Sequence, residues 1–281
     1  MNPQETREIL ITGCSSGIGL CVARGLRARG YTVFATARKP EDAQWLRDEG
    51  LGGYQLNLDD SDSIQQAVEQ VLEQTGGRLY ALFNNGAYGQ PGAVEDLPRR
   101  ALREQFETNV FGWLELTNRV IPVMRAQGYG RILQNSSVLG IVALPYRGAY
   151  NASKFAIEGF SDTLRMELHG SGVHVSLIEP GPILSEFRNN AHAAYRKHID
   201  PTGSVHRDAY AAMEKRLASE HAATPFTLPP EAVLKRVVHA LEARRPKVRY
   251  PVTVPTYVFA WLKRVLPHRG LDAAIRKLHR A

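Results

Sequence analysis

The chain has 281 residues, of which 43% are hydrophobic and 22% charged, so it can bury a full core and is neither low-complexity nor disordered. Its formal net charge of +7 suggests nucleic acid, an anionic membrane surface or an anionic ligand as partners. However, residues 235–281 contain 12 of the 35 Lys and Arg residues and only two acidic residues, so the rest of the chain is slightly acidic. This distribution argues against a nucleic-acid-binding surface spread over the whole protein.

The cysteines and the N-terminal residues indicate a cellular compartment. Cys14 and Cys21 give no disulfide framework and suit a reducing environment, and no metal site is predicted. The first eight residues contain no apolar signal core, and no run approaches the roughly 20 apolar residues that a membrane span requires. We therefore expect a cytoplasmic protein.

Short apolar runs rich in β-branched residues alternate along the chain with longer segments of helical period. The runs are residues 9–11, 32–34, 54–56, 79–83, 131–133 and 173–178, and the helical segments are near residues 61–75, 101–127 and 148–169. Strands that alternate with helices of this length predict parallel βαβ units. The predicted fold class is therefore α/β, a doubly wound parallel sheet flanked by helices, with a C-terminal helical extension.

The first predicted strand leads into a glycine-rich turn, and a helix follows at once. Such a turn lets the backbone approach a pyrophosphate, at which the N–H groups of the helix N-terminus then point. The glycine spacing alone is a weak signal, because tight turns that need a positive φ also contain it, but its position after the first strand strengthens it. The cofactor-binding residues predicted in this turn are Gly13, Ser15, Ser16, Gly17, Ile18 and Gly19.

Arg38 and Lys39 stand at the end of the second strand, where an acidic residue would favour NAD and an arginine favours the 2′-phosphate of NADP. The guanidinium of Arg38 offers a planar fork for a phosphate, and Lys39 adds a point charge beside it. The alternative for both residues is a solvated charge at a strand end. We predict NADP(H) in preference to NAD(H).

Tyr150 and Lys154 lie four residues apart at the start of a predicted helix and therefore share one face of it. A neighbouring ammonium favours the phenolate and so lowers the pKa of a tyrosine, which would let the pair exchange a proton near neutral pH. Ser137 follows the strand at residues 131–133, at the sheet edge where doubly wound folds bind ligands. Taken alone, the Tyr and Lys pair is as well explained by ordinary helix-surface residues.

These motifs, in this order, together with Asn84-Asn85 after the fourth strand, resemble the short-chain dehydrogenase/reductase (SDR) family over residues 7–253. The resemblance implies a Rossmann-like fold and homodimers or homotetramers formed through the two long helices. Extended relatives with epimerase or dehydratase activity fit less well, because their glycine spacing differs. The catalytic tetrad that the resemblance implies is Asn109, Ser137, Tyr150 and Lys154.

The family gives each member of this tetrad a role. Asn109 would hold a water for a proton relay, and Ser137 would orient the carbonyl or alcohol. Tyr150 would act as the general acid/base. Lys154 would lower the pKa of the tyrosine and bind the nicotinamide ribose.

The resemblance implies further cofactor contacts and two departures from the family pattern. The Asn-Asn-Ala-Gly of the family appears as residues 84–87 with the two small residues exchanged, so we expect the loop flexibility to differ. The acid that usually contacts adenine is replaced by Asn57, whose carbonyl can still accept from the adenine amino group. Ser185 stands where the family usually has Thr. The cofactor-binding residues expected from these segments are Asn57, Leu58, Asn85, Gly86, Tyr150, Lys154, Pro180, Gly181, Ile183 and Ser185.

We predict a catalytic domain at residues 1–253. It contains an insertion at residues 184–226 that we expect to act as a lid over the substrate. The residues around the expected carbonyl position are apolar, which favours a lipophilic aldehyde, ketone or alcohol over a charged sugar. The three histidines of the insertion lack the spacing of metal ligands and are interpreted as surface side chains. The predicted substrate residues are Ser137, Leu139, Tyr146 and Tyr150.

Residues 254–281 form a basic amphipathic extension in which one apolar stripe has helical spacing. Such a stripe can lie on an anionic membrane, cover the substrate entrance or form a subunit interface, and the sequence favours none of these uses. Residues 244–251 resemble a branch related to hydroxysteroid and retinol dehydrogenases and to bacterial NADP-dependent aldehyde reductases. The stripe consists of Val254, Tyr257, Val258, Trp261, Leu262 and Val265.

We therefore expect an NADP(H)-dependent oxidoreductase that interconverts a lipophilic aldehyde or ketone and its alcohol by hydride transfer. Two alternatives remain open. An NADP-binding redox sensor would use the same fold without turnover, although a sensor has no need of an intact catalytic tetrad. A 3-oxoacyl-carrier-protein reductase would use the same chemistry, but the extra C-terminal segment argues against it.

Overall fold

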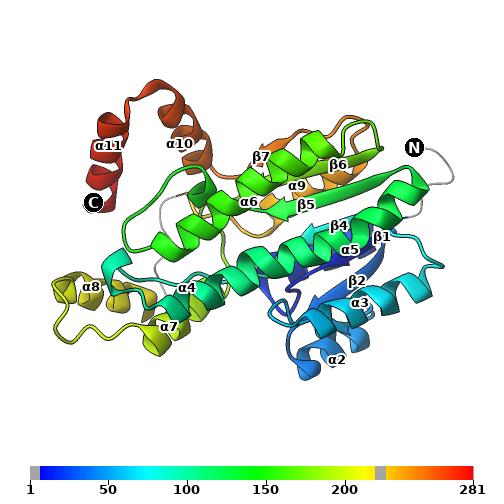
Figure 1. Ribbon diagram of the computed structural model, residues 1–281, viewed down its shortest axis with the longest axis horizontal. Coiled ribbons are helices and arrows are strands. Elements are labelled where there is room, and N and C mark those ends of the chain that lie inside the picture. The colour runs from blue at the N-terminus through cyan, green and yellow to red at the C-terminus, as the bar shows by residue number, and fades with distance from the viewer. Residues whose placement is uncertain (1–6, 219–225, 281) are drawn as a thin grey trace.

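The computed structural model describes residues 7–218 and 226–280, and its core is one seven-stranded parallel sheet (Figure 1). The strand order is β3-β2-β1-β4-β5-β6-β7, and the order reverses between β1 and β4, as in a doubly wound sheet. Every neighbouring pair of these strands is parallel. The strands are β1 (Glu8–Ile11), β2 (Thr32–Ala37), β3 (Tyr54–Gln55), β4 (Ala81–Asn84), β5 (Gly130–Asn135), β6 (Val173–Glu179) and β7 (Arg249–Pro251).

Helices cover both faces of the sheet. On one face, α1 (Gly17–Ala28), α2 (Pro40–Asp48) and α9 (Glu231–Glu242) pack with residues such as Leu26 and Val237. The other face is covered by α3 (Ser61–Gln74), α5 (Gly112–Gln127) and α6 (Gly148–Glu167). Because both faces are covered, the residues of the central strands are buried almost throughout rather than at alternate positions.

The remaining helices gather at the end of the molecule toward which the strands point (Figure 1). They are α4 (Arg99–Phe106), α7 (Phe187–His198), α8 (Arg207–Ala218), α10 (Val254–Val265) and α11 (His268–Arg280). In open parallel sheets the carboxyl ends of the strands form the ligand-binding edge. The predicted insertion at residues 184–226 therefore contains two helices at this edge, and its residues 219–225 lie outside the described part of the chain.

The predicted α/β fold is confirmed, and one predicted helix differs from the structure. The single helix expected near residues 101–127 consists of α4, a π-helical turn at Glu107–Phe111, and α5. A π-helical turn shifts the backbone hydrogen-bond pattern by one residue, and such turns are frequent at functional sites. Asn109 lies in this turn, so the break in the helix coincides with a predicted site residue.

The predicted C-terminal helical extension consists of α10 and α11, and most of the apolar stripe of α10 is exposed, although the Tyr257 hydroxyl accepts from Arg236 of α9 over 3.2 Å. Lys263 Nζ donates to the carbonyl oxygen of Ile141 over 2.6 Å, and Thr256 is buried. The stripe residues Trp261 and Val254 are 62% and 53% exposed. No helix in residues 7–218 or 226–280 is both long and apolar enough to span a membrane.

Candidate active site

The glycine-rich turn between β1 and α1 is shaped by close backbone approaches. Gly13 has a φ of +69°, and a Cβ atom there would lie 2.6 Å from the Cα atom of Gly86. A Cβ atom at Gly19 would lie 2.2 Å from the carbonyl oxygen of Gly13. Neither position can hold a larger residue without moving backbone, so the glycines are required by the turn itself.

The N-terminus of α1 fits a phosphate group. Ser16 is the N-cap, but its side chain makes no capping hydrogen bond, and the first turn of α1 contains no acidic residue. The first N–H groups of a helix have no partner within the helix and carry a partial positive charge. Ser15 is exposed and Ser16, Gly17 and Ile18 are half-buried, so this end of the helix is accessible to an anionic ligand.

The end of β4 is joined to the glycine-rich turn by hydrogen bonds. Thr12 Oγ1 accepts from the backbone N–H groups of Asn85 and Gly86, each over 2.8 Å. The Asn85 side chain donates to the carbonyl oxygens of Thr12 and Gly13 over 2.9 and 3.2 Å. Trp113 Nε1 donates to the Gly86 oxygen over 2.8 Å. Gly86 is therefore held between the turn and α5, and its close approach to Gly13 explains why glycine stands at this place.

Two basic side chains at the end of β2 are accessible. Arg38 and Lys39 are exposed, and Lys39 Nζ lies 3.9 Å from the exposed Glu41 carboxylate, a distance at which surface pairing contributes little. Asn57 Oδ1 accepts weakly from the N–H of Asp59 over 3.4 Å and keeps a lone pair for a further donor. Leu58 is buried nearby, with a side-chain carbon 3.2 Å from a Cβ placed at Gly86.

The segment after β6 crosses in front of the same edge. The Val138 N–H donates to the Pro180 oxygen over 2.8 Å, which ties this segment to the turn after β5. A Cβ atom at Gly181 would lie 2.1 Å from Thr253 Oγ1, and Ile183 pairs with Leu228. Ser185 Cβ lies 3.0 Å from a Cβ atom placed at Gly17. The predicted cofactor-binding residues after β6 and the glycine-rich turn therefore meet, as binding of one dinucleotide requires.

Tyr150 and Ser137 converge at the carboxyl end of β5. Burial raises the pKa of Tyr150 to about 12, and the hydrogen bond with Ser137 and the positive charge of Arg147 act in the opposite direction. Burial therefore dominates, and the positive charge that lowers the pKa of the phenol in this structure is that of Arg147. The phenol is therefore protonated at neutral pH. Ser137 Oγ also accepts from the N–H of Leu139 over 3.1 Å.

Lys154 is buried beneath the tyrosine. Its Nζ donates to the Asn135 oxygen over 2.8 Å and lies 4.2 Å from the centre of the Trp113 ring. Burial lowers the pKa of Lys154 to about 7, although the Glu158 carboxylate favours the ammonium. The same Nζ lies 5.6 Å from the centre of the Tyr150 ring. The ammonium is thus stabilised by a carbonyl and an aromatic face, and it is near its titration point at neutral pH.

The Asn109 side chain binds protein groups. Its Oδ1 accepts from the Tyr88 N–H over 3.2 Å, and its Nδ2 donates to the Tyr88 oxygen and to Ser153 Oγ over 2.9 and 3.2 Å. Both amide hydrogens are used, so the side chain fixes the loop after β4 against α6 rather than donating to a water. Ser153 of α6, which no sequence motif indicated, thus links α6 to the π-helical turn that contains Asn109.

The substrate side of the site differs in part from the prediction. The Phe187 ring of α7 stands edge-on to the Tyr150 ring, with 5.2 Å between the ring centres. Leu139, two residues after Ser137 in the sequence, is half-buried. Tyr146 packs on Tyr210 and His206 of the α8 region. No local sequence pattern indicates Phe187, because its contact with Tyr150 arises only when the insertion folds over α6.

The interpretation of the insertion histidines as surface side chains is wrong for His198. That side chain is 6% exposed, and its Nε2 lies 3.0 Å from Glu104. His206 and His192 also face carboxylates, those of Glu95 and Glu214. The histidines thus attach the insertion to the loop after β4 and to α4, and join α7 to α8.

Comparison with known proteins identifies the family. A family profile described as short chain dehydrogenase matches residues 7–196. An uncharacterized oxidoreductase of Escherichia coli strain K12, YbbO, is 42% identical over 270 residues, which cover 96% of this chain and 94% of that protein. The chain belongs to the short-chain dehydrogenase family.

Two further relatives of this short-chain dehydrogenase are named for the cofactor they use or contain. The NADPH-dependent 3-dehydrocapnine reductase of Ornithobacterium rhinotracheale is 32% identical and 96% of each chain is covered. A serine dehydrogenase solved with NADP+ is 26% identical, with 88% of this chain and 94% of that chain covered and a TM-score of 0.73. This short-chain dehydrogenase is therefore an oxidoreductase that acts on CH–OH groups with a nucleotide cofactor.

A cluster of charged side chains lies behind Lys154 in this short-chain dehydrogenase. Arg249 of β7 pairs with Glu158 and Asp162 of α6 over 3.1 and 2.7 Å. Its Nε lies 3.2 Å from Glu179 Oε1 at the end of β6, but this oxygen accepts no hydrogen bond from the described residues. Burial and the neighbouring Glu158 raise the pKa of Glu179 to about 8. Three carboxylates thus share one guanidinium, and the most buried one titrates last.

We expect Glu179→Gln to change the pH dependence of stability. The folded protein keeps a proton on Glu179 up to about pH 8, whereas an unfolded glutamate releases it near 4.5. The free energy of unfolding of the wild type therefore falls as the pH rises through this window, on the order of a few kcal/mol, and that of the variant lacks this fall. Thermal unfolding across the window measures the difference. Glu69→Gln, at an exposed position of α3, is the control, and parallel curves for wild type and Glu179→Gln would contradict the assignment.

Proposed function

We propose that this enzyme uses NADP(H) to interconvert a lipophilic aldehyde or ketone and its alcohol, with Tyr150 as the general acid/base. The observation that carries the proposal is the convergence of Tyr150, Ser137 and Lys154 in front of the glycine-rich turn, at the carboxyl edge of the sheet. A bound nicotinamide supplies the hydride chemistry at the carbonyl carbon. The protein groups supply proton transfer and orientation.

The protonation state of Tyr150 favours carbonyl reduction. Because its pKa is about 12, the phenol carries its proton at neutral pH and can donate it to a carbonyl oxygen. The Ser137 hydroxyl, which already shares a hydrogen bond with this phenol, is placed to donate to the same oxygen as negative charge develops. The ammonium form of Lys154, whose Nζ lies 5.6 Å from the centre of the Tyr150 ring, adds positive charge beside the phenol.

The surroundings of Tyr150 support an apolar substrate. The Phe187 ring contacts the tyrosine from the α7 side, and Gly89 is so close to Phe187 that a Cβ atom there would lie 2.8 Å from the ring. An aromatic side chain beside the reacting position excludes water and disfavours charged groups. We extend the predicted lid function to α7 and α8 on this ground.

Initial rates with a panel of aldehydes, ketones and alcohols, with NADPH and NADH in parallel, test this function. We expect reduction of lipophilic carbonyl compounds with NADPH. Binding of NADPH without turnover of any of these compounds would instead support a redox sensor. Turnover restricted to acyl-carrier-protein thioesters would support the reductase alternative.

We expect Arg38→Leu to weaken the use of NADPH selectively. The side chain is exposed at the end of β2, and loss of a charge-assisted hydrogen bond to a phosphate costs about 1.5–3 kcal/mol, or roughly ten- to a hundredfold in KM for NADPH. The KM for NADH serves as the internal control and should change little. Equal losses with both cofactors would show that Arg38 does not contact the 2′-phosphate.

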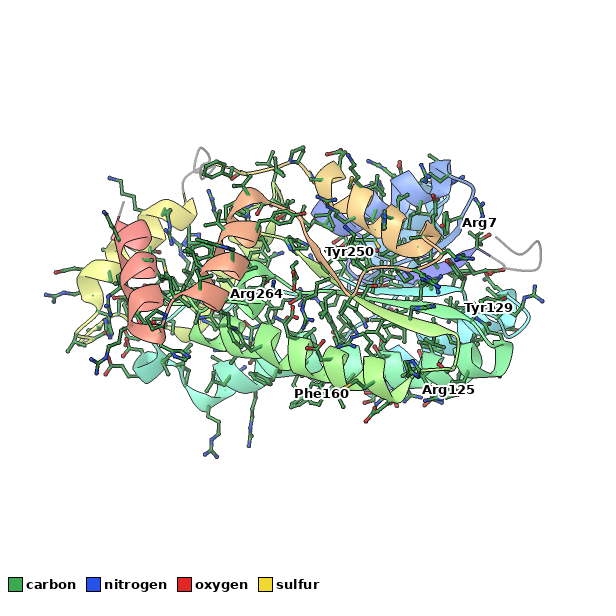
Figure 2. All side chains as sticks on the ribbon, turned by 90° about the horizontal axis from the view of Figure 1, so that it is seen from above. Arg7, Arg125, Tyr129, Phe160, Tyr250 and Arg264 are labelled. Atoms are coloured by element: carbon green, nitrogen blue, oxygen red, sulfur yellow. The ribbon has the colours of Figure 1, made fainter. Side chains whose placement is uncertain are left out.

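We also propose a homodimer or homotetramer formed through α5 and α6. Phe160 and Met166 of α6 are 47% and 63% exposed, and Figure 2 shows Phe160 on the outer side of this helix, away from the sheet. Phe111, which precedes α5, is 50% exposed. Large exposed apolar side chains on neighbouring helices are typical of subunit interfaces.

A further inference from the structure

The Tyr257 hydroxyl accepts from Arg236 of α9 over 3.2 Å, and apart from this contact the exposed residues of the α10 apolar stripe face away from the protein. Tyr257 and Val258 are 48% and 45% exposed, and Trp261 and Val265 are 62% and 52% exposed. Leu262 is half-buried. Exposure of this many large side chains on one helix is unusual for a surface that meets only water, and it marks an interaction site.

The inner side of α10 is fixed next to the catalytic centre. Thr256 is buried and lies close to Gly181, and Lys263 donates to Ile141 and lies 4.9 Å from the centre of the Phe155 ring. Ile141 directly follows the short 3-10 turn of Val138–Gly140, whose N-cap is the predicted catalytic Ser137. The helix therefore packs beside the substrate side of the site, and most of its apolar stripe faces outward.

The charge around the stripe favours an anionic partner. Residues 254–280 contain six Lys and Arg residues and one acidic residue, Asp272. Arg264, Arg269 and the α11 residues Arg276 and Lys277 are exposed. Two copies of this face would bring like charges together, whereas an anionic lipid surface complements them. Trp and Tyr are also the aromatic residues preferred at the boundary between lipid headgroups and acyl chains.

We propose that α10 and α11 form a peripheral docking site for an anionic lipid bilayer, with the α10 stripe inserted among the lipid headgroups. Membrane binding of an amphipathic helix combines burial of its apolar face with attraction of its basic residues to anionic lipids. In this orientation the substrate side of the site lies next to the bilayer. If the proposed function holds, a lipophilic substrate dissolved in the membrane reaches Tyr150 without crossing bulk water.

The test is co-sedimentation of the full-length chain with vesicles, either of pure phosphatidylcholine or of phosphatidylcholine mixed with phosphatidylglycerol. We expect binding to the anionic vesicles alone and its loss at high salt. The double variant Val258→Ser/Trp261→Ser should bind them at least about tenfold more weakly, because it removes the most exposed large side chain of the stripe and the valine one turn away. The matched control, Trp45→Ser/Val205→Ser, removes one exposed Trp and one exposed Val elsewhere and should bind as the wild type does.

Lack of binding to anionic vesicles, or equal binding by the wild type and the α10 double variant, would overturn the proposal. If the α10 variant instead changes the oligomeric state in light scattering while the wild type binds no vesicles, the stripe contacts a second copy of the chain and the proposal is wrong. Vesicle binding is measured without turnover, and turnover of a water-soluble aldehyde is measured without vesicles. The failure of this proposal and the failure of the proposed function are therefore distinguishable.

Discussion

Replacing Tyr150 with Phe should abolish most turnover while leaving NADPH binding nearly intact. The variant keeps the ring that packs against Phe187 and removes only the hydroxyl that interacts with Ser137. A positioned general acid contributes on the order of 10² to 10⁴ in rate, so we expect a loss of that size in kcat. Steady-state kinetics and NADPH fluorescence titration measure the two effects separately.

A matched substitution separates the chemistry from folding. Tyr54→Phe removes a half-buried tyrosine hydroxyl on β3, at the far edge of the sheet, and should leave kcat unchanged. Circular dichroism and thermal unfolding of both variants show whether the fold is kept. Wild-type turnover by Tyr150→Phe would exclude the tyrosine as the proton donor, and loss of NADPH binding would place it in the cofactor site instead.

Replacing Lys154 with Met should have the second largest effect, because it removes both a charge and a donor. The methionine keeps the volume between Trp113 and the end of β5 and removes the charge beneath Tyr150. We expect kcat to fall on the order of 10²-fold, and NADPH binding to weaken by about ten- to a hundredfold if the ammonium binds the ribose as the family resemblance implies. A variant that loses turnover without losing affinity would restrict the lysine to electrostatic support of the tyrosine.

The same substitution should change stability in a pH-dependent way. The pKa of Lys154 is about 7 in the folded protein against an ordinary 10.5, so between these values the unfolded chain binds more protons than the folded one. The contribution of this group therefore increases the wild-type free energy of unfolding as the pH rises from about 7 to 10.5. Below pH 7 the lysine is charged in both states, and the folded protein bears the full cost of burying that charge. Relative to the wild type, Lys154→Met should be most stable below pH 7 and should lose that advantage as the pH rises.

Chemical denaturation at several pH values measures this trend. Lys235→Met, at an exposed position on α9, is the control and should keep a constant difference from the wild type. A difference between Lys154→Met and the wild type that stays constant with pH would show that the lysine keeps its ordinary pKa in the folded protein. In that case Lys154 would be fully charged at neutral pH, and it would support Tyr150 as a permanent positive charge rather than as a group that gains and loses a proton.

Much of the fold and of the candidate site was predictable from local patterns. The alternation of apolar runs and helical segments predicts parallel βαβ units, because connections of that length must cross over the sheet. The Gly13–Gly19 turn and the Tyr150–Lys154 spacing are also local, since both depend on residues close in sequence. The break at Glu107–Phe111 was not predictable, because the period of the apolar residues barely changes across one π-helical turn.

What the sequence by itself determined is the fold class and the family, and it predicts Tyr150 and Lys154 as reacting side chains, because each of these depends on spacing along the chain. Only the tertiary structure decided the protonation of Tyr150 and Lys154 and the grouping of Glu179 with Arg249. It also decided that the α10 stripe faces solvent. The physical reason is that desolvation and charge pairing depend on every element packed around a side chain, and that a helical stripe specifies an apolar face but not which way it turns.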